Sequence, residues 1–164
     1  MLCGPAAGVF WDMNPHEHFM QLALEEARIA SQQGEVPIGA VLVREGVVIA
    51  RAHNRVEQLR NPAAHAELLL IQEATAATQQ KWLHECALYV TLEPCPMCAG
   101  AMLLARIPQL YFGAFDAKAG AAGTLFCLTA DPRLNHQVET WGGICANQSI
   151  ALLQQFFREQ RGTA

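Results

Sequence analysis

TLEPCPMCAGAM, residues 91–102, joins the end of an apolar run to a helical segment and places two cysteines at the junction. The overlapping residues 87–92, ALYVTL, are rich in the branched and aromatic side chains that favour a buried strand. A helix is predicted to follow over residues 97–106, so Cys95 and Cys98 fall at its beginning. Backbone N–H groups at a helix N-terminus favour negative charge, which helps to keep both thiols as thiolates. This placement predicts a site at the edge of a sheet, where the strands end.

A second motif, His65-Ala66-Glu67, lies thirty positions before Cys95 and completes a set of zinc ligands. His65, Cys95 and Cys98 make three ligands, and no second Cys-x-x-Cys or His-x-x-x-His pattern supplies a fourth. A structural zinc site is normally closed by four protein ligands, whereas a catalytic site keeps one position open for water. The ligand count therefore predicts a catalytic zinc ion, one per chain.

Glu67 is the carboxylate that this ligand set leaves over. It lies two residues beyond His65, within reach of a water on the metal but poorly placed to chelate beside it. Such a carboxylate takes the water's proton and later hands it to a leaving amine, while zinc lowers the pKa of that water to about 7. The combined pattern H-x-E…P-C-x-x-C is the signature of zinc nucleobase deaminases. A structural zinc site or a redox pair remains the alternative for the Cys-x-x-Cys taken alone.

The residues around the two motifs alternate between helical and strand patterns. Asn14 is the predicted N-cap of the first helix, with Pro15 at its first position. Helices are predicted over residues 15–33, 64–79, 97–106 and 147–160, and strands over residues 36–43, 47–50, 87–92 and 109–115, with a short strand near 138. This alternation predicts an α/β fold with parallel pairing, crossover helices, and helices on both faces of a mixed sheet of about five strands.

The composition predicts one globular domain over residues 14–164. The chain has 164 residues, of which 52% are hydrophobic, enough for a sizeable core. Residues 1–13 lack the basic start of a secretory signal and are predicted to form a disordered extension, with Met13 as a second candidate start. No apolar run reaches the roughly 20 residues that cross a bilayer, so we expect a cytoplasmic protein without a membrane partner.

The charge balance excludes indiscriminate nucleic-acid binding. The formal net charge is -4, with only 11 Lys and Arg residues, whereas proteins that grip many phosphates carry a basic excess. No DNA partner is expected, and any contact with RNA must depend on a local patch. Arg51, Arg55 and Arg60, in the region leading to His65, are candidates for that patch.

The chain also resembles the bacterial tRNA-specific adenosine deaminases, a branch of the cytidine-deaminase-like superfamily. The segments that carry the resemblance are VPIGAVLV (36–43), TLEPCPMCAGAM (91–102), FGAFDAKAGAAGT (112–124), Asn135-His136 and Phe156-Phe157-Arg158. The resemblance implies a three-layer α/β/α fold and a homodimer. It also implies conversion of adenosine to inosine at the wobble position, with the tRNA anticodon stem-loop as partner.

Four residues are implied by the resemblance to bind the substrate. Asn54 matches the asparagine that reads the flipped base, Asp116 an aspartate that contacts the neighbouring ribose, and Lys118 a residue near the phosphates. Phe157 matches an aromatic residue near the anticodon loop, while Phe115 stands where the family usually has a basic residue. Each of the four also has a plain structural interpretation: a turn cap for Asn54, a solvated loop residue for Asp116, a surface charge for Lys118, and core packing for Phe157.

Two other functions remain open at this point. A deaminase of a free base or nucleoside, such as guanine, cytosine or cytidine, would share the zinc chemistry, and a C-terminal segment that lids the pocket would favour it. A noncatalytic RNA-binding subunit is less compatible, because it has no need of Glu67. Glu93, which precedes the Pro-Cys motif, is predicted to support the metal site from outside the ligand set, and His136 to be a structural histidine.

Overall fold

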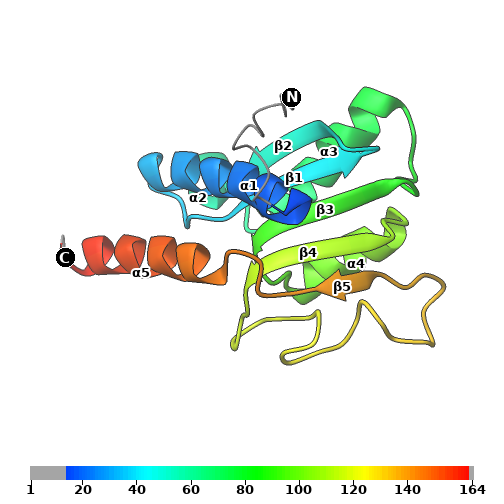
Figure 1. The fold of residues 1–164 in the computed structure, drawn as a ribbon. Coiled ribbons are helices and arrows are strands. Elements are labelled where there is room, and N and C mark those ends of the chain that lie inside the picture. The colour runs from blue at the N-terminus through cyan, green and yellow to red at the C-terminus, as the bar shows by residue number, and fades with distance from the viewer. Residues whose placement is uncertain (1–13, 163–164) are drawn as a thin grey trace, which may run out of the picture.

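The structure, a computed structural model, describes residues 14–162 (Figure 1). The predictions for residues 1–13, including a start at Met13, lie outside the described residues. One five-stranded sheet runs in the order β2-β1-β3-β4-β5. Its strands are β1 (Gly39–Arg44), β2 (Val47–His53), β3 (Cys86–Leu92), β4 (Gln109–Ala114) and β5 (Glu139–Trp141). The helices are α1 (Pro15–Gln32), α2 (Val56–Leu59), α3 (Ala66–Thr78), α4 (Pro96–Leu104) and α5 (Ala146–Gly162).

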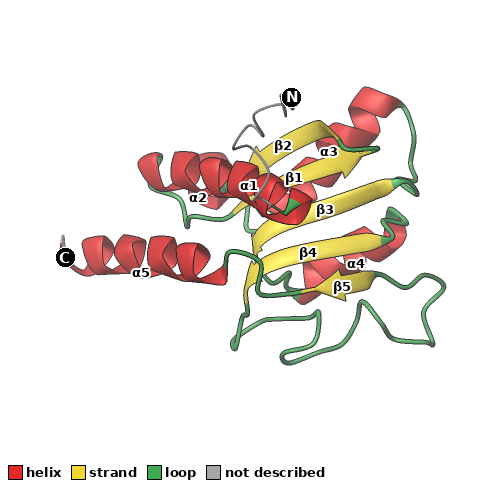
Figure 2. Ribbon diagram, in the orientation of Figure 1, coloured by secondary structure: helices red, strands yellow, loops and turns green. Residues whose placement is uncertain are grey.

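The helices cover both faces of the sheet, as Figure 2 shows, which confirms the predicted three-layer α/β/α fold. On one face, Met20 and Leu24 of α1 pack with Val41 of β1, and Leu152 of α5 joins the same cluster. On the other face, side chains of α3 and α4 share a larger core with the strands. None of the helices within residues 14–162 is long and apolar enough to cross a membrane.

Strand direction brings three strand ends to one edge of the sheet. β1 is antiparallel to β2 and to β3, whereas β3, β4 and β5 are parallel. The predicted mixed sheet is therefore confirmed, with parallel pairing in the half formed by β3, β4 and β5. Ala40 pairs with both Ala52 and Val90, and Val90 pairs with Phe112, so β2, β3 and β4 all end at the same edge. The segments that follow these three strands meet there.

The first predicted strand begins later than expected. It starts at Gly39 rather than at residue 36, because the chain turns around Pro37 and the N–H of Ile38 donates to the carbonyl of Val36 at 2.8 Å. Proline has no N–H to give to a strand partner, which is consistent with pairing beginning beyond it. The second strand is longer than predicted and extends to His53.

Small residues let α1 lie directly against β1. A Cβ atom on Gly39 would stand 2.1 Å from the carbonyl oxygen of Ala23 and 2.4 Å from the nitrogen of Ala27, so only glycine allows this approach.

The beginning of α1 is capped as predicted, because Asn14 Oδ1 accepts a hydrogen bond from the N–H of His16 at 3.1 Å.

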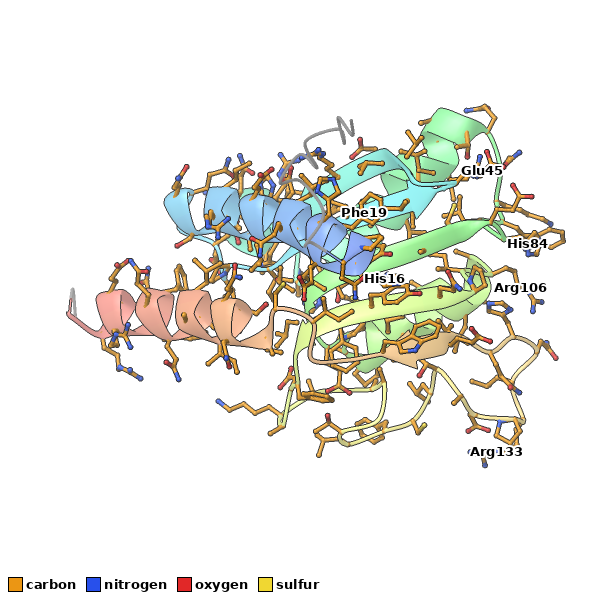
Figure 3. All side chains as sticks on the ribbon, viewed as in Figure 1. His16, Phe19, Glu45, His84, Arg106 and Arg133 are labelled. Carbon is orange, nitrogen blue, oxygen red and sulfur yellow. The ribbon has the colours of Figure 1, made fainter. Side chains whose placement is uncertain are left out.

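An aromatic stack ties α1 to the parallel half of the sheet. Figure 3 labels His16 and Phe19 on the part of α1 that overlies the strands. His16 Nδ1 lies 2.9 Å from the hydroxyl of Tyr89. Tyr89 stacks on Tyr111, and Tyr111 on Trp141, each with ring centroids 4.7 Å apart. Pairs of this kind stabilise a fold by about 0.5–1.5 kcal/mol each beyond the area they bury.

Candidate active site

The three predicted metal ligands come together where β2 and β3 end. His65 is the N-cap of α3 and Cys95 the N-cap of α4, and Cys98 lies in the first turn of α4. His65 Nδ1 lies 3.6 Å from the Sγ atom of each cysteine, and the three ligand atoms lie within 4.8 Å of one another. Tetrahedral ligands at zinc bond lengths stand about 3.6 Å apart, so the donor set and its spacing fit a zinc ion.

The two sulfurs are arranged to share one proton. The pKa of the Cys95 thiol falls to about 4, chiefly because the Cys98 thiol donates a hydrogen bond to it. The pKa of Cys98 rises, chiefly because of that same hydrogen bond and then because of burial. The hydrogen bond to Cys95 also raises the pKa of His65. A divalent cation held by these three ligands would take the place of the shared proton and release it.

Glu67 is buried beside the ligands, with only 4% of its surface exposed. It lies in the first turn of α3, with the buried thiol of Cys98 close to its carboxylate. Burial is the main cause that raises the pKa of Glu67 above its ordinary value. A carboxyl group with a raised pKa is suited to accept and return a proton near neutral pH.

A pocket of about 520 Å³, which we call the metal-side pocket, opens next to His65. Asn54 forms part of one wall, and Phe156 and Phe157 of α5 form part of another. Phe156 is buried, whereas Phe157 is 45% exposed. Core packing is therefore the wrong interpretation of Phe157, because Ser149 and Phe156 form the buried face of α5 and successive helical residues point about 100° apart.

A second pocket, which we call the basic pocket, shares Phe157 with the first and measures about 600 Å³. Lys118, Arg158 and Arg161 line it. Asp116 does not line either of the two pockets; its Oδ1 atom accepts a hydrogen bond from the backbone N–H of Lys118 at 2.8 Å. The structure thus brings Lys118 and Phe157 together, and Asp116 shapes the turn that carries Lys118.

Arg51, Arg55 and Arg60, the arginines singled out from the sequence, line neither of these two pockets. Arg51 forms an ion pair with Glu25 at 3.5 Å, and Arg55 Nε donates to Gln58 Oε1 at 2.7 Å. The positive charge of the basic pocket comes instead from α5 and from the segment after β4.

Glu35 is a pocket residue that sequence reasoning missed. It lines the metal-side pocket with 1% of its surface exposed, and its carboxylate accepts from the backbone N–H groups of Glu57 at 3.1 Å and Gln58 at 2.7 Å. These bonds hold the unpredicted helix α2. Asn54 Nδ2 lies 3.5 Å from Glu35 Oε2, so the amide of Asn54 turns its donor side toward the carboxylate. A lone carboxylate after Gly34 carries no periodic signal that would have identified it.

His136 and Phe115 each contact another part of the chain. His136 Nε2 lies 2.8 Å from the carbonyl oxygen of Ile107, which confirms the prediction of a structural histidine. Phe115, at the position that is usually basic in the resembled family, packs edge-on against Phe112 with ring centroids 5.0 Å apart. Its aromatic ring therefore has a partner inside the chain, although 62% of the residue is exposed.

Comparison with known proteins gives concordant relatives. Residues 14–161 match a family model described as MafB19-like deaminase. The tRNA-specific adenosine deaminase of Bacillus subtilis is 50% identical over 149 residues, which are 91% of this chain and 92% of the relative. The tRNA-specific adenosine deaminase of Aquifex aeolicus is 46% identical over 145 residues, 88% of this chain and 95% of the relative.

Solved structures agree with these relatives. A structure from work on A-to-I editing by tRNA:A34 deaminases at the wobble position superposes with a TM-score of 0.80 at 47% identity, covering 83% of this chain and 99% of that one. A guanine deaminase from Nitrosomonas europaea superposes with a TM-score of 0.72 at 26% identity, covering 85% and 83%. The chain belongs to the family of tRNA-specific adenosine deaminases.

Proposed function

We propose that this protein converts adenosine to inosine at the wobble position of tRNA, using a zinc ion held by His65, Cys95 and Cys98. The identity with proteins named tRNA-specific adenosine deaminase, 50% over 91% of the chain, supports the reaction and the substrate. The structural observation that carries the proposal is the basic pocket, which adjoins the metal-side pocket through Phe157. An RNA strand that places one base beside the metal would extend its neighbouring phosphates into that second pocket.

Glu67 is the proposed proton carrier of the reaction. A bound zinc ion supplies Lewis acidity, which makes water reactive near neutral pH. Glu67 accepts the proton of the water that attacks C6 of adenine, and later donates it to the departing N6 amine. One C6–O bond forms, the C6–N6 bond breaks, the second proton of the water ends on N1, and the products are inosine and ammonia. The burial that raises the pKa of Glu67 favours the protonated form that the second half of the reaction needs.

Base recognition is proposed to combine Asn54 and Phe157. Glu35 turns the donor side of the Asn54 amide toward itself, which leaves the acceptor Oδ1 for the pocket. The Oδ1 atom of Asn54 can accept a hydrogen bond from the N6 amine of adenine, as asparagine does when it reads the N6/N7 edge. The exposed ring of Phe157 offers a surface on which a base of a single-stranded loop can stack, worth about 1–3 kcal/mol.

Two alternatives are weaker. The likeness to a guanine deaminase, and the contribution of α5 to the metal-side pocket, favour a deaminase of a free base. A free base, however, has no phosphate that would use the three cations of the basic pocket. A noncatalytic RNA-binding subunit has no use for Glu67, whose burial beside the metal ligands has a cost in free energy.

A substrate comparison tests the proposed function. The zinc-loaded protein is incubated with an anticodon stem-loop that carries adenosine at the wobble position, and separately with free adenosine, guanine, cytosine and cytidine. We expect inosine and ammonia from the stem-loop alone, with no product from a matched stem-loop that carries guanosine at that position. Ammonia from a free base, or the absence of saturable stem-loop binding at low salt, would contradict the proposal.

Replacing Asn54 by alanine is expected to impair base recognition more than metal binding. The change removes the pocket-facing amide but leaves the three ligand side chains in place, so kcat/KM should fall about tenfold or more, the usual effect of losing about 1–3 kcal/mol of base discrimination. Steady-state kinetics and zinc content are measured side by side. Asn147→Ala, at an exposed position of α5, is the matched control. Unaltered kinetics in Asn54→Ala would show that Asn54 does not recognise the base.

We also propose that the protein is a homodimer and, because its proposed substrate is a tRNA, that it works in the cytoplasm. An apolar groove of about 510 Å³ supports the dimer, since Trp82, Leu104 and Leu134 line it and are all exposed in the single chain. Exposed apolar patches of this kind commonly mark protein interfaces. Light scattering tests the proposal: a mass of one 17.9 kDa chain at micromolar concentration would contradict it.

A further inference from the structure

Glu93 is a buried carboxylate that takes no part in the proposed chemistry. It is 2% exposed and lies two residues before the ligand Cys95. Oε1 accepts from the backbone N–H groups of Ala122 at 3.0 Å and Thr124 at 3.1 Å. Oε2 accepts from the backbone N–H of Asp116 at 3.0 Å and from the hydroxyl of Thr124. All these donors belong to one segment, residues 115–125, which we call the substrate loop.

The substrate loop is built around this carboxylate. A Cβ atom on Gly120 would stand 2.4 Å from Glu93 Oε2 and 2.5 Å from the carbonyl oxygen of Asp116, so any larger residue displaces one of them. The N–H of Gly120 donates to that same carbonyl at 2.9 Å. The need for glycine at this position is a second observation that the loop and the carboxylate fit each other.

The loop is thereby joined to the turn that carries the metal ligands. Besides the bonds to Glu93, the N–H of Ala121 donates to the carbonyl of Pro94 at 2.8 Å. The backbone N–H of Asp116 donates to Glu93, and the Asp116 carboxylate accepts from the backbone N–H of Lys118. A continuous set of hydrogen bonds therefore runs from Glu93, two residues before Cys95, to the backbone of Lys118 in the basic pocket.

We propose that Glu93 is a positioning residue for the RNA substrate. Together with its fit to Gly120, it holds the substrate loop at one distance from the metal ligands, so that Lys118 meets the RNA without first being ordered. This inference rests on the proposed function, since it concerns how the substrate of that site is held. A loop already fixed in its bound shape saves the entropy cost of ordering it on binding. We call the hydrogen bonds between Glu93 and the substrate loop the tether. Loss of the tether should weaken RNA binding, while metal binding and the chemical step persist.

Hydrogen exchange of the zinc-loaded protein without RNA tests the tether itself. Glu93→Gln keeps the size of the side chain but puts an NH2 group where two donors need an acceptor. We expect faster exchange at the amides of Asp116, Ala122 and Thr124, with zinc content and exchange in α3 unchanged. Unchanged exchange in the substrate loop would overturn the proposal, whatever substrate the enzyme uses.

Steady-state kinetics on the anticodon stem-loop test the consequence. We expect Glu93→Gln to raise KM about tenfold, in line with the loss of hydrogen bonds to a charged group, while kcat stays within about threefold. If kcat and zinc content fall together while KM is unchanged, Glu93 supports only the metal site, and the proposal is overturned. If the wild-type protein fails to deaminate the stem-loop, the proposed function fails. The exchange measurement then still shows whether Glu93 holds the substrate loop.

Milder variants test the same proposal even if Glu93→Gln fails to fold. Thr124→Val removes only the hydroxyl bond and should raise KM about threefold, whereas Thr124→Ser keeps that bond and should behave like the wild type. Gly120→Ala should reproduce Glu93→Gln, while Gly162→Ala, which adds its methyl group in open space, should change nothing. A wild-type KM in Gly120→Ala, or equal effects of the two Thr124 variants, would overturn the proposal.

Discussion

Glu67→Gln is expected to remove nearly all turnover while the protein keeps its zinc. Glutamine has the same shape as glutamate but cannot accept the proton of the attacking water, and general acid–base catalysis contributes about a hundredfold to ten-thousandfold. Glu67 is buried beside the ligands without belonging to the His-Cys-Cys set, so the metal site should persist. We expect kcat to fall by about a hundredfold to ten-thousandfold.

Single-turnover deamination of the stem-loop and zinc content by atomic absorption measure this result. Glu73→Gln is the matched control, because Glu73 lies on the same helix α3 but is exposed to solvent. Preserved activity in Glu67→Gln would refute the acid/base role. Loss of zinc in Glu67→Gln would instead make Glu67 a support of the metal site.

Replacing either cysteine of the ligand set by alanine is expected to remove both the metal and the activity. Loss of even a residue that only supports a ligand costs about 10–100-fold in metal affinity, so loss of one ligand in three should cost more than about a hundredfold. Cys98 is fully buried and Cys95 is partly exposed, yet the two variants should lose zinc alike, because each contributes one sulfur atom.

Metal content and activity are measured after dialysis against free zinc at a fixed concentration. Cys127→Ala, which removes an exposed free cysteine, should keep both properties. A chelator should inactivate the wild type, and added zinc should restore it. Normal zinc content in Cys95→Ala or Cys98→Ala would show that the ligand set is wrong.

Local sequence patterns predicted most of the elements, because each element is marked by its own residues. Asn14 and Pro15 mark the beginning of α1, and the apolar run ending at Leu92 marks β3. Errors arose where a partner elsewhere in the chain decides the outcome. The turn at Pro37 delays β1, and α2 exists because the distant Glu35 accepts from its first N–H groups.

Site residues divide in the same way. His65, Cys95 and Cys98 were predicted as ligands from residue type and count, and the structure places them within reach of one metal ion. Glu35 and Gly120 carried no sequence signal, since the importance of each depends on atoms far away along the chain. Phe157 was ambiguous for a related reason: the apolar pattern of α5 does not say which of two adjacent aromatics is buried.

The sequence by itself determined the chemistry: two ligand motifs and a spare carboxylate, each at the beginning of a helix whose first residues are marked locally. Ligand type and helix starts are short-range properties, so they can be read along the chain. Only the tertiary structure decided what surrounds that chemistry. The basic pocket joins Lys118 to Arg158 and Arg161, and Glu93 grips a loop up to 31 residues away. Crossover connections and packing across the sheet set these distances, and no local pattern encodes them.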